Sequence, residues 1–179
     1  MRTFVAAEIT DQGILNSIKN MQSNLRIEAK PIELQNMHFT LLFLGEISED
    51  MAQRVQSELK IIQFDSFDIS FEGVGAFPKP KFPRVVWIGV KNGADQLVKL
   101  AKTVEEKMAP LGFKSDKEFK PHITIFRIKN KIGDITDELI KYSNEKFGLQ
   151  KISEIKFKKS VLTPSGPIYS DLQVVKASK

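Results

Sequence analysis

The sequence predicts a mixed α+β protein built from two similar halves. Strand-like and helix-like patterns alternate along its 179 residues, and each half reads strand, helix, histidine-bearing strand, helix, strand. Arg2 opens the first strand 36 residues before His38, and Arg84 opens the fourth strand 38 residues before His122. These nearly equal spacings suggest an internal duplication. The alternative is coincidence between two ordinary units, since the halves share little residue identity.

The first half carries three predicted strands and two helices. Residues 3–9 are apolar and β-prone, residues 38–44 form a second strand that ends at Gly45, and residues 67–71 alternate as a half-buried strand. Ser48 is the expected N-cap of the second helix. The two helices show apolar residues at helical spacing, namely Ile14, Ile18, Met21 and Leu25, and then Met51, Val55, Leu59 and Ile62. Residues 73–83 are rich in Gly and Pro, so we expect a loop that is a boundary or a binding rim.

The second half repeats this order. Strands are expected at residues 84–90 and 122–126, with a helix between them that ends near Pro110 and a short helix behind Asp134. The chain closes with strands at residues 147–152, 155–162 and 168–175. We expect one bilobal unit over residues 1–179, with pseudo-repeats at about 1–75 and 84–150 and C-terminal strands within 152–176.

The composition narrows the available chemistry. The chain has no cysteine, which excludes disulfides, thiolate nucleophiles and Cys-ligated metals. It has 2 histidines, so a three-imidazole site is excluded as well. The net charge of +5 fits either a solvated surface or attraction to a polyanion. Two basic clusters stand out, one at Lys79, Lys81 and Arg84 and one at Lys151, Lys156, Lys158 and Lys159.

Both histidines lie in the same four-residue pattern of His, apolar, Thr, apolar. The pattern occurs at residues 38–41 and again at residues 122–125. On a strand, residues i and i+2 point to one face, so His38 projects with Thr40 and His122 with Thr124. If a pseudo-twofold relates the halves, the two pairs converge on one groove. Two imidazoles can then act as acid and base, and two hydroxyls can bind phosphate oxygens.

Other interpretations of the histidines are a non-catalytic position on each strand and a two-histidine metal site. A single strand histidine favours the first, but the repeated pattern argues against it. The sequence offers no third ligand at a suitable spacing, so we expect no metal.

These motifs resemble those of the 2H phosphoesterase superfamily, which is defined by two His-x-Thr/Ser-x patterns. The chain is most similar to its RNA 2′,3′-cyclic phosphodiesterase group, the LigT-like proteins formerly called 2′-5′ RNA ligases. Further stretches that carry the resemblance are residues 2–9, 37–46, 75–78, 84–87, 119–127 and 162–169. The resemblance implies a bilobal α+β fold in which two antiparallel sheets line a central groove, with helices outside.

The resemblance also implies roles for residues. His38 is the expected proton donor and His122 the proton acceptor, while Thr40 and Thr124 bind the phosphate. The implied reaction is metal-independent hydrolysis of an RNA 2′,3′-cyclic phosphate to a 2′-phosphomonoester, with no cofactor. Its reverse, 2′-5′ RNA ligation, would use the same groups. The sequence does not itself decide which histidine is acid and which is base.

Arg127 lies five residues after His122, where family members often carry Arg, and is a third candidate phosphate ligand. Strict alternation puts it on the face opposite His122, so it reaches the groove only if the strand bends. Phe77 and Tyr169 are candidate substrate-binding residues, with a core position as the alternative for Phe77. Trp87 is expected in the core. Glu8 is expected as a surface carboxylate, the alternative being that it orients a group in the groove.

The expected partner is RNA with 2′,3′-cyclic phosphate or 2′-phosphate ends. A second hypothesis keeps the site and changes the substrate to a small nucleotide such as ADP-ribose 1″,2″-cyclic phosphate. A third is a non-catalytic module that binds RNA ends. No segment has the length or apolarity of a membrane span or signal peptide, so a cytoplasmic monomer is expected.

Overall fold

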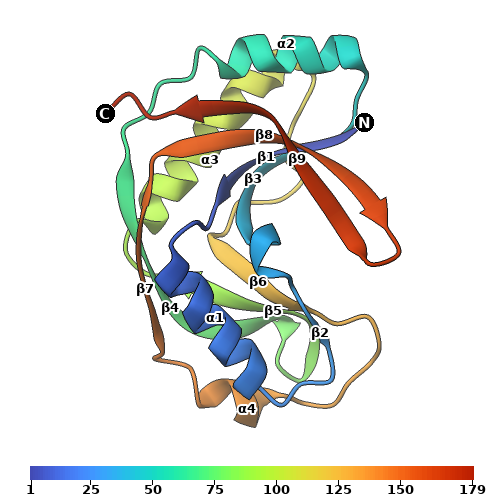
Figure 1. Cartoon of the computed structure of the whole chain (residues 1–179), viewed down its shortest axis with the longest axis vertical. Helices are drawn as coiled ribbons and strands as arrows, with labels where there is room; N and C mark the ends of the chain where they lie inside the picture. The colour runs from blue at the N-terminus through green and yellow to red at the C-terminus, as the bar shows by residue number, and fades with distance from the viewer.

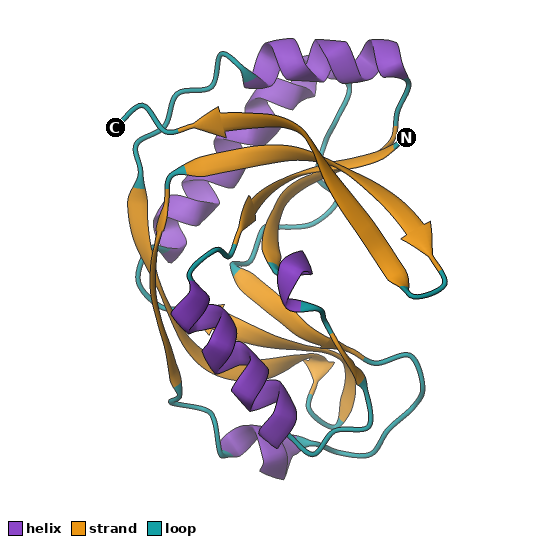
Figure 2. Ribbon diagram, viewed as in Figure 1, coloured by secondary structure: helices purple, strands orange, loops and turns teal.

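The computed structural model describes residues 1–179 and contains two antiparallel sheets with helices packed against them (Figures 1 and 2). The strands are β1 (Arg2–Glu8), β2 (Lys30–Pro31), β3 (His38–Glu46), β4 (Phe67–Lys79), β5 (Phe82–Val90), β6 (His122–Arg127), β7 (Lys146–Ile152), β8 (Glu154–Thr163) and β9 (Gly166–Lys176). The α-helices are α1 (Gln12–Asn24), α2 (Glu49–Leu59), α3 (Ala94–Met108) and α4 (Thr136–Ile140), and 3-10 turns cover Leu34–Asn36 and Ala109–Leu111.

The first sheet has the strand order β3-β1-β8-β9, and the second has the order β2-β6-β5-β4-β7. Every pairing in both sheets is antiparallel. The predicted α+β class with two antiparallel sheets is therefore confirmed. The short strand β2 was not predicted, since two residues carry no readable period.

The two halves pack their first helices onto each other's sheets. Helix α1 follows β1 of the first sheet but lies against β7 and β6 of the second. Helix α3 follows β5 of the second sheet but lies against β3 and α2 of the first. Strand β4, which begins within residues 1–75, joins the second sheet. Each sheet is thus covered by a helix that follows a strand of the other sheet, as Figure 1 shows for α1.

One continuous hydrophobic core holds both sheets. Its 38 buried residues include Val5 and Phe39 from the first sheet and Ile88 and Ile123 from the second. Burial of this apolar surface is the main stabilising contribution. Because the sheets share the core, their relative position is set by close packing rather than by a linker.

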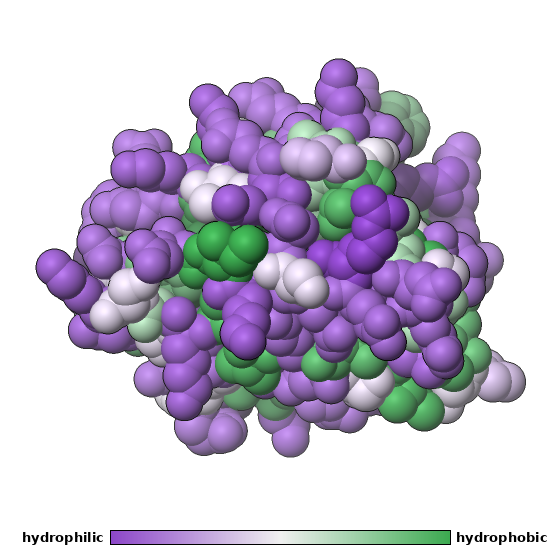
Figure 3. Space-filling view, turned by 90° about the horizontal axis from the view of Figure 1, so that it is seen from above, coloured by the Kyte–Doolittle hydropathy of each residue, from purple (hydrophilic) through white to green (hydrophobic).

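The helices begin where the sequence supplies caps. Ser48 Oγ accepts a hydrogen bond of 3.1 Å from Met51 N, which confirms the predicted cap of α2. Asp11 caps α1 in the same way, accepting from Ile14 N at 2.9 Å. Helix α2 lies at the top of Figure 1, and the surface seen from that side is largely hydrophilic with scattered apolar patches (Figure 3). No helix is long and apolar enough to cross a membrane.

The prediction of a loop at residues 73–83 is wrong. Strand β4 runs through Gly73 and Gly75 to Lys79 and turns tightly into β5 at Phe82. Glycine is needed within the strand, because Gly73 has a positive φ of 79° inside a register shift against β5. The prolines are accommodated because Pro78 and Pro83 pair near the end of the hairpin, beside a second register shift.

Candidate active site

Both histidine motifs line one groove. The groove has a volume of about 610 Å³, and its walls include His38 and Thr40 of β3 together with His122 and Thr124 of β6. Each motif begins its strand, and each strand pairs antiparallel with the opening strand of its half, β1 or β5. The structure therefore brings together the four residues that the repeated pattern predicted.

The imidazole of His38 is held at both nitrogens. Its Nδ1 lies 2.7 Å from the Asn36 carbonyl oxygen, and its Nε2 lies 3.0 Å from Thr40 Oγ1. A carbonyl oxygen only accepts, so Nδ1 carries the proton that it donates to Asn36. In the neutral ring Nε2 is then an acceptor for the Thr40 hydroxyl, and in the imidazolium it is a donor.

His122 is held at Nδ1 only. Its Nδ1 lies 2.5 Å from the carbonyl oxygen of Lys120, which is two residues upstream, just as Asn36 is two residues upstream of His38. The neutral ring thus has its proton on Nδ1 and a lone pair on Nε2. Both histidines are therefore fixed in the tautomer in which Nε2 exchanges protons with a ligand.

Aromatic rings fix the orientation of both imidazoles. His38 stacks on Phe4 with ring centroids 5.0 Å apart and meets the edge of Tyr169 at 5.4 Å. His122 meets Phe77 edge-on at 5.3 Å and lies 6.4 Å from Trp87. Edge-to-face contacts of this kind restrict ring rotation.

The two candidate substrate-binding residues differ in position. Tyr169 lines the groove, whereas Phe77 packs against His122 and is not among the residues that line it. Trp87 is half-buried and supports the same imidazole from β5.

Arg127 reaches the groove because β6 contains a bulge. Trp87 pairs with Thr124 and Val86 with Phe126, so Ile125 has no partner on β5. Ile125 and Phe126 are both buried in succession, and the alternation is reset so that Arg127 lines the groove with Thr124. The carbonyl of Ile125 is not left unpaired, since it accepts from Ile32 N and Gln22 Nε2, both at 2.9 Å.

The electrostatics of the groove favour an anion. Its wall carries Arg2, Lys117, Lys120 and Arg127 and a single carboxylate, Glu118. Sequence reasoning missed Arg2 and the two lysines, because nothing in a surface Lys or Arg shows which groove it will face. The predicted basic cluster at Lys79, Lys81 and Arg84 lies outside the groove wall.

Burial changes the protonation of His38. Burial lowers the pKa of its imidazole below the ordinary value, and the Lys158 ammonium acts in the same direction. The Asn36 carbonyl and the Glu8 carboxylate raise the pKa but do not offset the lowering. In the free protein the neutral form of His38 is therefore favoured more than in an exposed histidine. Burial also raises the pKa of the Tyr169 hydroxyl.

Comparisons with known proteins agree with this geometry. Residues 11–149 match the model of the 2′-5′ RNA ligase superfamily. The chain is 47% identical over 176 residues to the RNA 2′,3′-cyclic phosphodiesterase of Archaeoglobus fulgidus, covering 97% of this chain and 99% of the relative. It is 43% identical over 152 residues to the Aquifex aeolicus protein of the same name, covering 82% and 81%.

Solved structures share the fold. The crystal structure of E. coli LigT with 3′-AMP superposes with a TM-score of 0.83 at 23% identity, covering 99% of this chain and 98% of that chain. The MHV ns2 PDE domain is more distant, with a TM-score of 0.56 at 18% identity, covering 84% and 97%. On the family match and the full-length relatives, the chain belongs to the 2′-5′ RNA ligase superfamily, in its group of RNA 2′,3′-cyclic phosphodiesterases.

Proposed function

We propose that this protein hydrolyses RNA 2′,3′-cyclic phosphate ends to 2′-phosphomonoesters by acid–base catalysis with two histidines. The observation that carries the proposal is the shared groove, in which two His-Thr pairs present Nε2 atoms fixed by equivalent Nδ1 hydrogen bonds. The full-length relatives that carry the name RNA 2′,3′-cyclic phosphodiesterase support the substrate class.

In the proposed reaction His122 Nε2 accepts a proton from water. The water oxygen forms a bond to phosphorus while the bond from phosphorus to the 3′-oxygen breaks in line with it. His38, protonated on Nε2, donates its proton to the leaving 3′-oxygen. One water is consumed, and the products are a 2′-phosphomonoester and a free 3′-hydroxyl.

The donor role of His38 requires an imidazolium, although burial lowers its pKa in the free protein. A bound phosphodiester supplies the missing counter-charge. An anion beside an imidazole favours the protonated form and raises its pKa. The bound substrate thus favours the protonated form of His38. The Thr40 hydroxyl then no longer donates to Nε2 and can bind a phosphate oxygen.

Three further groups bind the phosphoryl oxygens in this proposal. The hydroxyls of Thr40 and Thr124 donate to them from opposite walls of the groove, and the Arg127 guanidinium donates two hydrogen bonds as a fork. Arg2, Lys117 and Lys120 attract the flanking RNA phosphates. Ligation through a 2′-5′ bond uses the same groups in reverse.

The regiochemistry of the product tests the proposal. An RNA oligonucleotide with a 2′,3′-cyclic phosphate end is incubated with the protein, and the product is identified by phosphorus NMR. A 2′-phosphate is expected, because the 3′-oxygen leaves; a 3′-phosphate or an unchanged substrate overturns the proposal. A cyclic mononucleotide is run in parallel, since a salt-dependent preference for the oligonucleotide identifies RNA as the substrate.

We also propose that the protein is a cytoplasmic monomer. Cell fractionation tests its location, and gel filtration tests its oligomeric state.

A further inference from the structure

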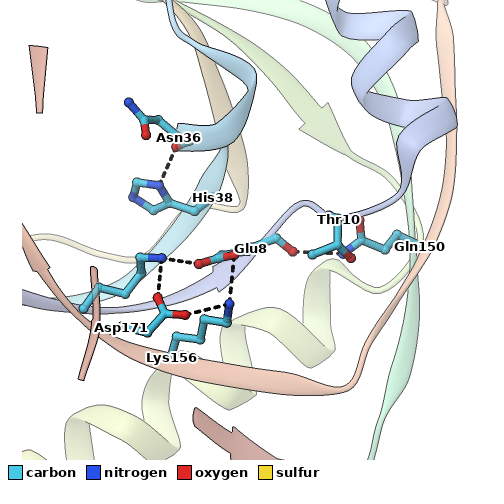
Figure 4. Close-up of polar contacts among 8 residues, drawn as sticks. Glu8, Thr10, Asn36, His38, Gln150, Lys156 and Asp171 are labelled. Carbon is cyan, nitrogen blue, oxygen red and sulfur yellow. Dashed lines mark hydrogen bonds and ion pairs between the residues drawn. The ribbon is translucent and has the colours of Figure 1, made fainter. Parts of the chain in front are cut away.

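Four charged side chains form a closed ring beside His38. Lys158 Nζ donates to Glu8 Oε1 and, at 2.7 Å, to Asp171 Oδ1. Lys156 Nζ lies 3.2 Å from Glu8 Oε2 and 3.0 Å from Asp171 Oδ2. Each lysine thus contacts both carboxylates, and each carboxylate contacts both lysines. Figure 4 shows Glu8 between His38 on one side and Lys156 and Asp171 on the other.

The ring follows from the register of the first sheet. Lys156 and Lys158 are two residues apart on β8 and point to one face. Lys158 pairs with Asp171 of β9 on one side, and β1, which carries Glu8, pairs with β8 on the other. The ring corrects two expectations from the sequence. Glu8 is not a surface carboxylate, and Lys156 and Lys158 are neutralised rather than available to a polyanion.

The ring is electrically neutral, and three of its four side chains are poorly exposed, whereas Asp171 is 37% exposed. The side chains of Lys158 and Lys156 are 9% and 17% exposed, and that of Glu8 is 21% exposed. The hydrogen bonds that Asp171 accepts from both lysines outweigh its burial and hold its pKa below the usual range. Two lysines balance two carboxylates in the ring, so removing one member leaves a single uncompensated charge next to the site.

Glu8 is fixed in place from the second sheet. Gln150 of β7 donates from Nε2 to the Glu8 carbonyl oxygen at 2.9 Å, and its Oε1 accepts from Thr10 N and Asp11 N at 2.8 and 3.0 Å. Gln150 is 7% exposed, so this clamp is in the interior (Figure 4). The end of β1 that carries Glu8 cannot shift without breaking the contact between the lobes.

Both signs of charge in the ring act on His38. Glu8 is its direct partner across the β1–β3 pair, and opposed residues in antiparallel strands lie side by side. Lys158 disfavours the imidazolium and Glu8 favours it. The titratable or charged groups around His38 belong to its own sheet and to the groove wall. In the sheet they are Glu8 of β1, Lys156 and Lys158 of β8, and Tyr169 and Asp171 of β9. On the groove wall they are Arg2, Lys117, Glu118, Lys120, His122 and Arg127.

The other half has no counterpart of Glu8. His122 occupies in the β5–β6 pair the place that His38 occupies in the β1–β3 pair, but its partner is Gly89. A side chain cannot enter there without a clash, because a Cβ on Gly89 would lie 2.9 Å from the Glu72 carbonyl oxygen. The charge ring therefore distinguishes two histidines whose Nδ1 atoms are held by equivalent hydrogen bonds.

We propose that Glu8, Lys156, Lys158 and Asp171 are positioning residues that set the protonation of His38 and so make the two histidines inequivalent. This inference rests on the proposed function, in which the two histidines have different tasks. None of the four side chains lines the groove. The ring acts through His38, and the direction of its effect depends on which sign of charge is removed.

Imidazole NMR of the free protein tests the ring without an activity assay. The chain has 2 histidines, so two sets of imidazole signals are followed as the pH is changed. The signals that disappear in His122→Asn belong to His122, and the others belong to His38. Glu8→Gln leaves the ring with an excess positive charge, and the midpoint of the His38 titration is expected to move to lower pH. Lys158→Met leaves an excess negative charge, and the midpoint is expected to move to higher pH. The double variant is neutral again and is expected to lie between the two.

Controls separate charge from loosened packing. Glu138→Gln removes a carboxylate that is 17% exposed and paired with Lys141 on α4, away from the groove, and is expected to leave both titrations unchanged. If Glu8→Gln does not fold, Asp171→Asn, at a side chain that is 37% exposed, is expected to move the midpoint to lower pH as well. Unchanged midpoints, or a shift in the same direction for opposite charges, would overturn the proposal.

The pH profile of kcat/KM gives a second readout. Because His38 is the proton donor in the proposed reaction, its deprotonation sets the high-pH limb. That limb is expected to follow the NMR midpoint in each variant. If the low-pH limb moves instead, the acid and base roles are exchanged, and the proposed mechanism fails while the titration still supports the ring.

Discussion

The indole of Trp87 lies against the backbone of Gly75 so closely that a Cβ there would lie 2.3 Å from the ring. Trp87 in turn supports the imidazole of His122 across the β5–β6 pair. A glycine that sequence reasoning assigns to a loop is thus part of the wall behind a proposed proton acceptor.

This contact predicts that Gly75→Ala is destabilising. The methyl group would have to displace the indole, and overpacking of this kind typically costs about 1–3 kcal/mol. We expect a lower midpoint in urea unfolding and a reduced kcat, since His122 loses its support. Gly133→Ala is the matched control, because a Cβ at Gly133 meets nothing within 4 Å. Equal stabilities for the two variants would show that Trp87 is not held as described.

Substitution of either histidine is expected to reduce turnover strongly. His38→Ala removes the proposed acid and His122→Ala the proposed base, and each loss is expected to lower kcat by roughly 10²–10⁴-fold. Circular dichroism should show that both variants stay folded, since neither side chain belongs to the hydrophobic core. Near-wild-type turnover by either variant on a 2′,3′-cyclic end would exclude two-histidine catalysis.

The histidine motifs are predictable from the sequence because their chemistry depends only on local geometry. A strand puts residues i and i+2 on one face whatever surrounds it, so the pairing of His38 with Thr40 needs no tertiary information. The same holds for the caps and buried faces of the helices. The pattern of α1 shows that one face is buried, but not that the face meets the sheet of the other half.

Arg127 and residues 73–83 mark the limit of such reasoning. The bulge at Ile125 reverses the face of every later residue on β6. The residues of that strand give no signal from which the bulge could be predicted. In β4, Gly and Pro are signals for turns when read locally, yet here they accommodate the bulges and the indole of Trp87. Both cases are decided by contacts between strands that are distant in sequence.

Arg127 is expected to contribute to phosphate binding through the shape of its guanidinium as well as its charge. Loss of a charged hydrogen-bond partner is typically worth about 1.5–3 kcal/mol. Arg127→Ala is therefore expected to lower kcat/KM by roughly 10- to 150-fold. Arg127→Lys keeps the charge but not the fork, so an intermediate loss is expected. Arg84→Ala, at an exposed position outside the groove wall, provides the control in steady-state assays; if it is as impaired as Arg127→Ala, the effect is general electrostatics.

Activity is expected to persist in excess EDTA. The proposed proton transfers and phosphate contacts use only imidazole, hydroxyl and guanidinium groups. The structure contains no group of three or more His, Asp or Glu side chains placed to hold a metal ion. The rate on a cyclic phosphate substrate is measured before and after dialysis against the chelator. A loss of activity that added divalent metal restores would favour the two-histidine metal site instead.

The half-buried imidazole of His38 predicts a specific acid sensitivity of the fold. In the unfolded chain a histidine titrates near ~6.5, whereas burial lowers the pKa of His38 in the folded protein. Between these two values the unfolded state binds a proton that the folded state does not. The free energy of unfolding therefore falls as the pH drops below ~6.5. The stability that depends on neutral His38 is fully present above that pH and is lost as the pH falls to the pKa of the folded protein.

Urea unfolding at about pH 7.5 and about pH 5.5 measures this contribution. His38→Gln has no imidazole to titrate there, so its free energy of unfolding is expected to change less between the two pH values than that of the unsubstituted protein. His122→Gln retains His38 and is expected to retain the acid-induced loss. An equal loss in His38→Gln and the unsubstituted protein would mean that the acid sensitivity arises at other groups.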